Sequence, residues 1–211
     1  DIGSVGVVKK MTVKIFKIFK PKFTWTRTKI INLSMATILL FECMVTWGIG
    51  LNNNTFTSFS LIVAFILLIY GIALKIYGLS KIEKLKGSLN GNIEFNIESI
   101  KINGTIFDLN TIQKIEISGV DWLGMDLNNQ RQGFNYENNL SNGIENFLTI
   151  YFCDNSKIRV QFQQQYALEF REIQNIITHY YVNGKIGYLN CVDILGLDKK
   201  DDWNAFKKLK I

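Results

Sequence analysis

The sequence predicts an α+β protein in which a two-helix transmembrane hairpin precedes an antiparallel β domain that one amphipathic helix caps. Two long apolar segments in the first half of the chain indicate the hairpin. Short segments that alternate apolar and polar residues follow and indicate strands, and a segment with helical periodicity comes after them. The length of 211 residues accommodates one ordinary soluble domain together with such a hairpin.

The two apolar segments have the length and composition of membrane-spanning helices. Residues 30–51 carry one charge, that of Glu42, and residues 51–74 carry none. About 20 helical residues cross a hydrocarbon core. We therefore expect spanning helices over about 30–50 and 57–77, within a hairpin of 30–79 that turns through an uncharged polar segment. Two alternatives are disfavoured. A cleaved signal peptide would have a shorter apolar region than these segments. A buried hairpin of a soluble protein would need other large apolar elements to cover it, and the sequence has too few of them.

Charge is distributed unevenly along the chain and predicts the orientation of the hairpin. Residues 1–86 contain 12 Lys/Arg and 3 Asp/Glu, a net charge of +9, whereas residues 87–211 contain 12 and 15, a net charge of −3, so that the total is +6. By the positive-inside rule both termini are cytoplasmic in a multi-pass protein of the inner membrane. A nucleic-acid-binding protein would be more uniformly basic, so we expect no nucleic-acid partner.

The first 29 residues form a basic arm. At 100° per residue, lysines and apolar side chains of residues 7–23 separate onto two faces, which is typical of a helix that lies in the headgroup plane. A disordered basic leader that only determines topology is the alternative. The chain opens with Asp1 rather than methionine, and Met11, which precedes a basic run, would suit a start. The lysines expected to anchor the protein to the membrane are Lys10, Lys14, Lys17, Lys20, Lys22, Lys81, Lys84 and Lys86.

Glu42 is an acidic residue within the first apolar segment. A charged side chain near a bilayer centre costs about 2.5–3.5 kcal/mol on insertion scales. One interpretation is a functional group that senses a proton or ligand or joins protomers. The other is a carboxyl group that the hairpin merely packs inward.

The soluble half, residues 87–184, reads as short strands followed by a helix. Apolar residues alternate over Ile93–Ile97, Ile100–Ile102, Leu148–Phe152 and Ile158–Phe162, and Asn103-Gly104 is a hairpin signal. An amphipathic helix is expected over 165–183. Residues 119–143 are rich in Asn and Gly without a clean period, so they form either a long loop or an irregular strand with a flexible tip. In the tail, 185–211, Asp201 or Asp202 would cap a short helix.

Two segments carry a resemblance to a known family. GNIEFNIESIKINGTIFDLNTIQKIEIS and FLTIYFCDNSKIRVQFQ, followed by a helix, resemble a bacterial pleckstrin-homology-like (PH-like) domain of the membrane-anchored kind, which two N-terminal transmembrane helices precede. The resemblance covers about residues 30–183. It implies a PH-like antiparallel β-barrel or sandwich and a tethered topology, but no activity. Residues 91–104 contain only Lys101 beside Glu94 and Glu98, so no specific phosphoinositide binding is expected.

Few residues suggest chemistry. The single His179 should be exposed, without a neighbouring nucleophile, and no catalytic or nucleotide-binding motif occurs. Three dispersed cysteines without a CxxC pair predict structural, reduced thiols and no zinc site. We expect no cofactor, no metal and no catalytic residue. The long loop is the candidate binding surface, together with the exposed sheet edge, and its candidate residues are Trp122, Asp126, Arg131 and Tyr136.

These features predict a non-enzymatic membrane protein. Its partners would be the lipid bilayer and either a protein or a second copy of the chain, which the cytoplasmic domain binds. An alternative places the function in the membrane segment, where Glu42 would serve a small transport, sensing or immunity-type role and the soluble domain would regulate it.

Overall fold

A computed structural model describes residues 14–48, 54–128 and 135–210, which divide into two compact units. The β unit comprises the described residues of 14–20, 88–122 and 143–210. The hairpin unit comprises those of 21–87 and 123–142. The chain passes from one unit to the other after residues 20, 87, 122 and 142, so each unit is assembled from separate stretches of sequence.

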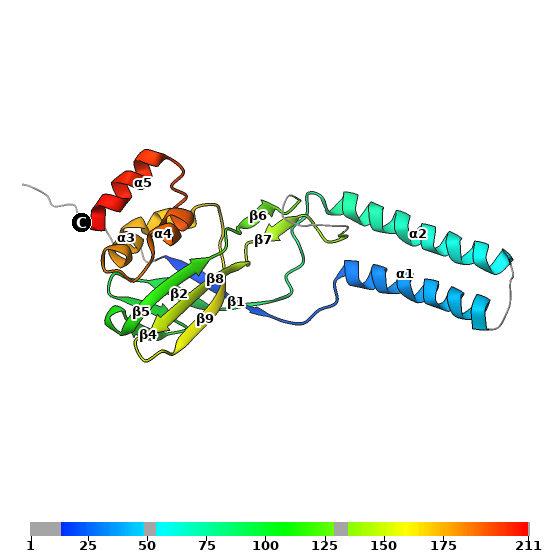
Figure 1. Ribbon diagram of the computed structural model, residues 1–211, viewed down its shortest axis with the longest axis horizontal. Helices are drawn as coiled ribbons and strands as arrows, with labels where there is room; N and C mark the ends of the chain where they lie inside the picture. Colours follow the sequence, from blue (N-terminus) through cyan, green and yellow to red (C-terminus); the bar gives the residue numbers. More distant parts are fainter. Residues whose placement is uncertain (1–13, 49–53, 129–134, 211) are drawn as a thin grey trace, which may run out of the picture. The chain divides into compact units, whose positions relative to one another are not determined.

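One sheet forms the framework of the β unit (Figure 1). Its strand order is β4-β3-β2-β1-β9-β8-β5, and every pairing with a described register is antiparallel. The strands are β1 (Ile15–Pro21), β2 (Gly87–Phe95), β3 (Ser99–Ile102), β4 (Thr105–Asp108), β5 (Ile112–Ser118), β8 (Asn146–Phe152) and β9 (Lys157–Gln163). Within the described residues β4 and β5 are open edges. The antiparallel sheet is therefore confirmed, but it does not close into the expected barrel.

The alternating sequence pattern corresponds to the buried face of this sheet. Ile93 and Phe95 of β2 are fully buried and stand opposite Ile102 and Ile100 of β3. Asn103 and Gly104 join β3 to β4 with φ values of 51° and 87°, which is the backbone that a tight primed turn requires. The strands therefore follow local sequence signals.

β1 corrects the prediction of an interfacial helix over residues 7–23. Within the described part of that range, Ile15–Pro21 is a strand that pairs with β9, placing Ile18 opposite Phe162. Phe16 is buried, stacks on Phe170 with 4.8 Å between ring centroids, and meets Phe95 and Phe162 edge-on. A short basic-apolar pattern fits both the helical and the strand period, and partners on both sides supply β1 with backbone hydrogen bonds.

Helices follow the last strand. The helix expected over 165–183 begins later: a 3-10 turn, Glu169–Ile173, leads into α3 (Gln174–Val182). The tail folds into α4 (Tyr188–Leu195), which was not predicted, and α5 (Lys200–Lys207), whose N-cap is Lys199 rather than Asp201 or Asp202. Phe206 of α5 is buried and stacks on Tyr181 of α3 at 4.9 Å, so the tail packs on its own domain.

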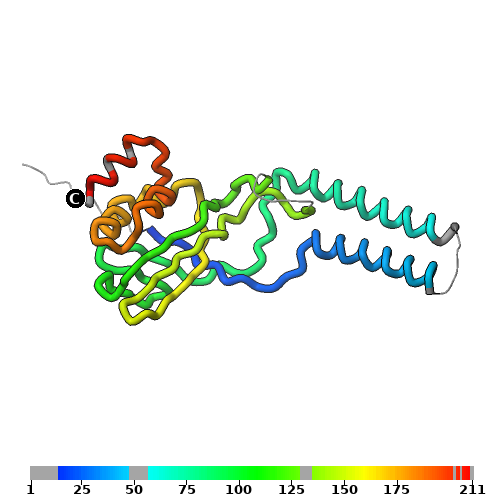
Figure 2. The backbone as a smooth tube through the Cα atoms, viewed as in Figure 1, coloured from blue at the N-terminus to red at the C-terminus, as the bar shows by residue number. Residues whose placement is uncertain are grey.

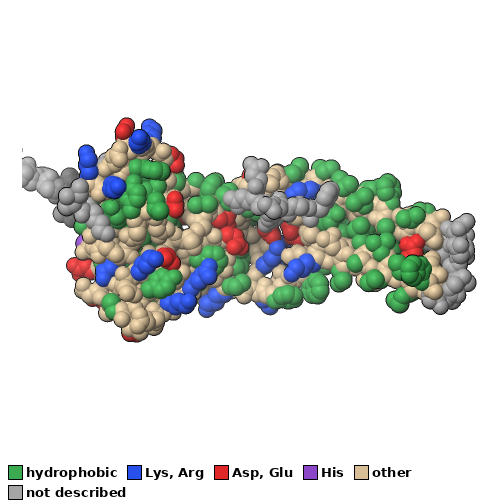
Figure 3. All heavy atoms as spheres, viewed as in Figure 1, with side chains coloured by type: hydrophobic (Ala, Val, Ile, Leu, Met, Phe, Trp, Pro, Cys, Tyr) green, Lys and Arg blue, Asp and Glu red, His purple; other side chains and the backbone are tan. Residues whose placement is uncertain are grey.

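The hairpin unit contains two long apolar helices that run beside each other (Figure 2). They are α1 (Arg27–Cys43), which continues as one π-helical turn at Met44–Gly48, and α2 (Asn54–Gly78). The windows Arg27–Trp47 and Thr57–Gly78 are long and apolar enough to span a membrane, and only 6% and 11% of their residues are buried. In Figure 3, apolar side chains occur along the whole visible length of the two helices.

Two short strands complete the hairpin unit. β6 (Leu123–Asp126) pairs with β7 (Leu140–Asn142), and backbone hydrogen bonds connect β7 to the chain just after α2. Both strands come from the segment 119–143, for which the sequence leaves a long loop or an irregular strand open. The linkers on either side of the hairpin are joined as well, because the Lys22 N–H donates to the Lys86 carbonyl at 2.8 Å.

Candidate functional site

A pocket of about 270 Å³ opens on the β unit and is the candidate binding site. Three stretches of chain form it: the segment after β5, the loop between β9 and α3, and α4. Its lining residues are Gly119, Val120, Trp122, Gln164, Ala167, Leu168, Phe170, Asp193 and Ile194.

Buried polar groups hold the first wall of the pocket. Asp121 lies between Val120 and Trp122, and its side chain accepts a hydrogen bond from the Glu145 N–H at 2.9 Å. Asn146, which is fully buried, accepts from the Asp121 N–H at 3.1 Å and donates to the Asp121 carbonyl at 2.7 Å. These contacts place Val120 with 59% of its surface exposed at the pocket.

An ion pair positions the second wall. Glu169 is only 1% exposed, and its carboxylate accepts from the Gln165 N–H at 2.6 Å and from Lys14 Nζ at 2.7 Å. Leu168 between them has φ 58° and ψ 29°, a left-handed conformation that is rare for a bulky residue. Because such strain persists only where the surroundings enforce it and clusters at binding sites, the loop has the character of a preformed site.

Lys14 therefore has a role that differs from the expected membrane anchoring. Its ammonium group also lies 3.1 Å from Glu172 and stands over the Tyr166 ring. Burial by itself lowers the pKa of Lys14, but hydrogen bonds to Glu169 and Glu172 outweigh this effect and hold the pKa above 10.5. Lys14 remains charged and neutralises a carboxylate that would otherwise be buried alone.

Arg171 connects the loop to the third wall. Its guanidinium donates to the carbonyls of Leu195 and Gly196 at 2.7 and 2.6 Å, at the end of α4. This places Ile194, which is buried, and Asp193, which is exposed, at the pocket. Of the nine lining residues, Asp193 alone carries a charge. The pocket thus combines an apolar interior with one carboxylate.

The hairpin unit contains a second constructed feature, residues 135–140, which we term the clasp. The clasp binds the first turn of α1: the Tyr136 N–H donates to Thr28 Oγ1 at 2.9 Å, and the Thr28 N–H donates to Glu137 Oε1 at 3.2 Å. An acidic side chain is favourable at a helix N-terminus, where backbone N–H groups lack partners. Arg27 donates to the Asn138 side chain at 3.1 Å.

The clasp also binds the end of α2. Lys75 donates to Asn139 Oδ1 at 3.3 Å, and the Asn139 N–H donates to the Gly78 carbonyl at 2.9 Å. The Tyr136 ring, 4% exposed, lies against Gly71 so closely that a Cβ atom there would be 2.5 Å from Tyr136 Cε1. The clasp therefore joins the two helices at the end where the hairpin begins and ends.

The four candidate residues of the long loop do not form one surface. Trp122 lines the pocket in the β unit. Tyr136 is buried against α2, and Asp126 is exposed on β6, where it accepts from the Asn128 N–H and from Asn139 Nδ2. Arg131 lies outside the described residues. Several asparagines of this segment bind helix ends and turns. An exposed loop can have the same Asn-rich composition, so composition alone does not reveal this role.

The basic residues have varied surroundings, and Lys10 lies outside the described residues. Lys20, Lys22 and Lys84 are exposed, and Lys81 is exposed with its ammonium 4.6 Å from the centre of the Tyr77 ring. Lys17 donates to Asn92, and Lys86 forms an ion pair with Glu83. The exposed lysines therefore keep the accessibility that membrane anchoring would require.

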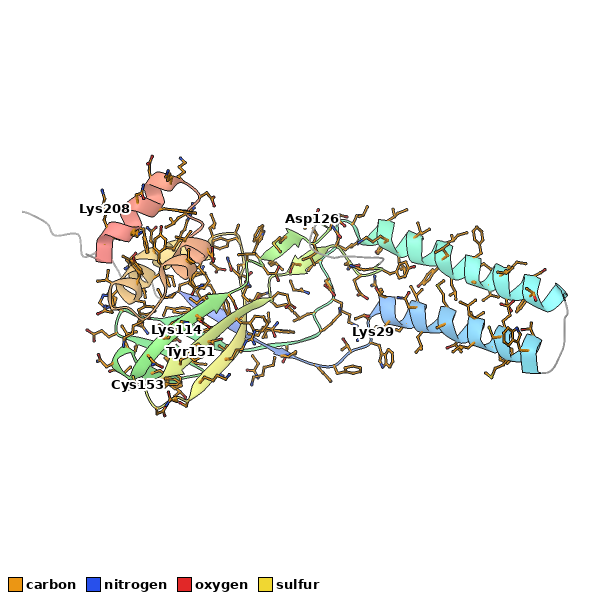
Figure 4. The ribbon with its side chains drawn as sticks, viewed as in Figure 1. Lys29, Lys114, Asp126, Tyr151, Cys153 and Lys208 are labelled. Atoms are coloured by element: carbon orange, nitrogen blue, oxygen red, sulfur yellow. The ribbon has the colours of Figure 1, made fainter. Side chains whose placement is uncertain are left out.

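The remaining titratable side chains of interest are Glu42 on α1 and a group on the surface of β5 and β8. Glu42 is half-buried on α1, and no described residue donates a hydrogen bond to its carboxylate. In Figure 4, Lys114 and Tyr151 lie on the adjacent strands β5 and β8, and both bind the Glu116 carboxylate on the surface. Among residues 14–48, 54–128 and 135–210, no group of three or more His, Cys, Asp or Glu could hold a metal ion.

Of the residues that line the pocket, the sequence pointed only to Trp122. Glu169 and Leu168 fall in a segment with helical periodicity, and Lys14 falls in a basic run, so nothing local distinguishes them. No known protein family, curated protein or solved structure matches the chain. Function must therefore be argued from the two units themselves.

Proposed function

We propose that this protein is a membrane-anchored, non-enzymatic binding module: the hairpin spans a bilayer, and the β unit binds a polypeptide on the cytoplasmic side. The observation that carries the proposal is a preformed apolar pocket on a unit whose chain is interrupted by an exposed apolar hairpin. Such a protein recruits a partner to the membrane surface or holds a second copy there.

Exposure of the hairpin supports a membrane location. Large apolar side chains on α1 and α2, such as Leu40 at 64% and Phe65 at 62%, are exposed. Apolar surface in water costs about 25 cal/mol per Å², so these helices need lipid or protein around them. Windows of 21 and 22 residues are about 31 and 33 Å long, close to a hydrocarbon core of about 30 Å.

The residues at the hairpin ends support its orientation. Arg27 and Lys29 lie at the start of α1, and Lys75 lies in the last turn of α2, so one end of the hairpin is basic. Trp47, 92% exposed, lies near the other end. By the positive-inside rule the basic end, and with it the β unit, belongs in the cytoplasm, and an inner-membrane location in a bacterium follows from the family resemblance.

The PH-like resemblance supports a binding role. Antiparallel strands followed by the packed helix α3 agree with that fold, although the open edges β4 and β5 differ from a closed PH barrel. The residues that line the pocket include no Ser, Cys, His, Lys or Arg, which favours a binding role over catalysis and over phosphoinositide binding.

The proposal is tested by photocrosslinking in native membranes. A photoreactive residue replaces Val120 at the pocket in one variant and Ile106, 68% exposed on the edge strand β4, in another. We expect a discrete adduct, with a partner or a second copy, at Val120 only. Adducts at Ile106 only would place binding at the sheet edge, and no adduct at either position, or release of the protein by alkaline carbonate, would contradict the proposal.

A further inference from the structure

We infer that the pocket accepts one large apolar side chain of a partner polypeptide that has a Lys or Arg beside it. This inference rests on the proposed binding function and specifies its ligand. It combines three observations about the pocket: its volume, its single carboxylate and the hydrogen bonds that hold its walls.

The volume suits one large apolar side chain. Pockets for drug-sized ligands usually measure about 300–1,000 Å³. The cavity here measures about 270 Å³, and Val120, Trp122, Leu168, Phe170 and Ile194 provide apolar contacts. Protein interfaces typically gain much of their affinity from one aromatic or aliphatic anchor in such a pocket.

The charge indicates which neighbours the anchor has. Asp193 lies at the pocket on the exposed side of α4, and no described residue donates a hydrogen bond to its carboxylate. Lys14 is bound to Glu169 and Glu172, which leaves Asp193 as the charged residue of the pocket lining. A cation is therefore favoured next to the anchor. An anionic lipid head group would be repelled, which favours a polypeptide over a lipid.

The walls indicate that the pocket exists before the ligand arrives. Lys14, Glu169 and Arg171 hold the loop through hydrogen bonds of 2.6–2.7 Å, and Leu168 keeps its left-handed conformation within that frame. A preorganised pocket loses little conformational entropy on binding. Short peptides that present the anchor should therefore be bound without the rest of the partner.

The test uses the full chain in detergent micelles and three peptides in the same Gly/Ser background. One peptide carries Trp between two Lys, one carries Trp between two Glu, and one carries Ala between two Lys. Binding is followed by saturation-transfer NMR of the peptides. We expect the Lys-flanked Trp peptide to bind about three- to tenfold more tightly than the Glu-flanked one, as an exposed ion pair allows, and the Ala peptide not to bind.

Variants assign the binding to the pocket. Asp193→Asn should remove most of the preference for Lys over Glu. Ala167→Trp, at an exposed lining position, should fill the pocket and abolish binding, whereas Ile106→Trp adds the same ring on β4 and should leave binding unchanged. Thermal unfolding of each variant verifies that it is folded.

Three outcomes would overturn the inference. Binding that survives Ala167→Trp, or that favours the Glu-flanked peptide, would show that the pocket or its charge has been misassigned. Absence of binding to all three peptides would also overturn it. The proposed function would still stand if photocrosslinking through Val120 captured a partner, and it would fail with the inference only if that adduct were missing too.

Discussion

The ring of Tyr136 lies against Gly71 of α2, at a point where a Cβ atom would stand 2.5 Å from Tyr136 Cε1. This contact places a side chain from the middle of the chain on a helix that the sequence assigns to the membrane. The contact fixes the position of the clasp near the end of α2. Glycine suits position 71 because any larger residue would clash with the Tyr136 ring.

Gly71→Val should displace the clasp, because overpacking of a closed contact costs about 1–3 kcal/mol. We expect amide hydrogen exchange at Tyr136, Asn139 and Leu140, whose N–H groups donate to Thr28, Gly78 and Lys81, to become at least about tenfold faster. Ala73→Val, at an exposed position of the same helix, is the matched control. Unchanged hydrogen exchange in Gly71→Val would show that the clasp does not depend on the contact between Tyr136 and Gly71.

Phe16→Ala should destabilise the β unit by about 3–5 kcal/mol, because the fully buried ring contacts Phe95, Phe162 and Phe170. Chemical denaturation followed by tryptophan fluorescence measures the change. Ile15→Ala, at a position 47% exposed on the same strand, should change stability far less. Equal effects of the two variants would argue against β1 as a central strand.

A fragment that starts at Gly87 should not fold stably, because it lacks β1 between β2 and β9. Joining residues 14–22 to residues 86–210 through a short linker should restore folding, since the Lys22 N–H and the Lys86 carbonyl are 2.8 Å apart. Cooperative thermal unfolding of the fusion but not of the fragment is the expected result. A fragment as stable as the fusion would contradict the sheet order.

Lys14→Gln should destabilise the protein by about 1–3 kcal/mol near neutral pH, because Glu169 would remain buried without its cation. The pKa of Lys14 is raised above 10.5 in the folded state, so its contribution is fully present below that pH and declines as the pH rises through the folded-state value. From neutral pH upward, the stability difference between wild type and variant should therefore stay constant and shrink only above about pH 10.5. Lys20→Gln, at an exposed position, serves as the control, and a difference that already shrinks between neutral pH and that value would refute the assignment.

Labelling of the Cys153 thiol tests on which side of the membrane the β unit lies. It is exposed at the end of β8, as Figure 4 shows, whereas Cys191 is buried. A membrane-impermeant maleimide should label Cys153 after cell lysis but not in intact cells. Cys153→Ser should remove this signal. Labelling in intact cells that Cys153→Ser removes would place the β unit outside and reverse the proposed topology, whereas labelling that survives Cys153→Ser would come from Cys43, which is also exposed.

The elements that the sequence identified share one property: each depends on a pattern within a short stretch of chain. Length and apolarity identify α1 and α2, strict alternation identifies β2, β3, β8 and β9, and Asn103-Gly104 identifies a turn. The arm before Pro21 has a short pattern that fits both the helical and the strand period and that leaves an interfacial helix or a disordered leader open, and only partners on both sides make it a strand.

The sequence alone therefore determined the α+β fold class, the two apolar helices and most of the strands. Local periodicity and hydropathy are properties of neighbouring residues, so they can be read without the tertiary structure. Only the tertiary structure decided that Lys14 neutralises Glu169, that Leu168 is strained at a pocket, and that Tyr136 lies on Gly71. These pairs are far apart in the chain, and their members are unremarkable in their own surroundings. They acquire a role because burial removes water and leaves each polar or bulky group dependent on the partner that the fold brings to it.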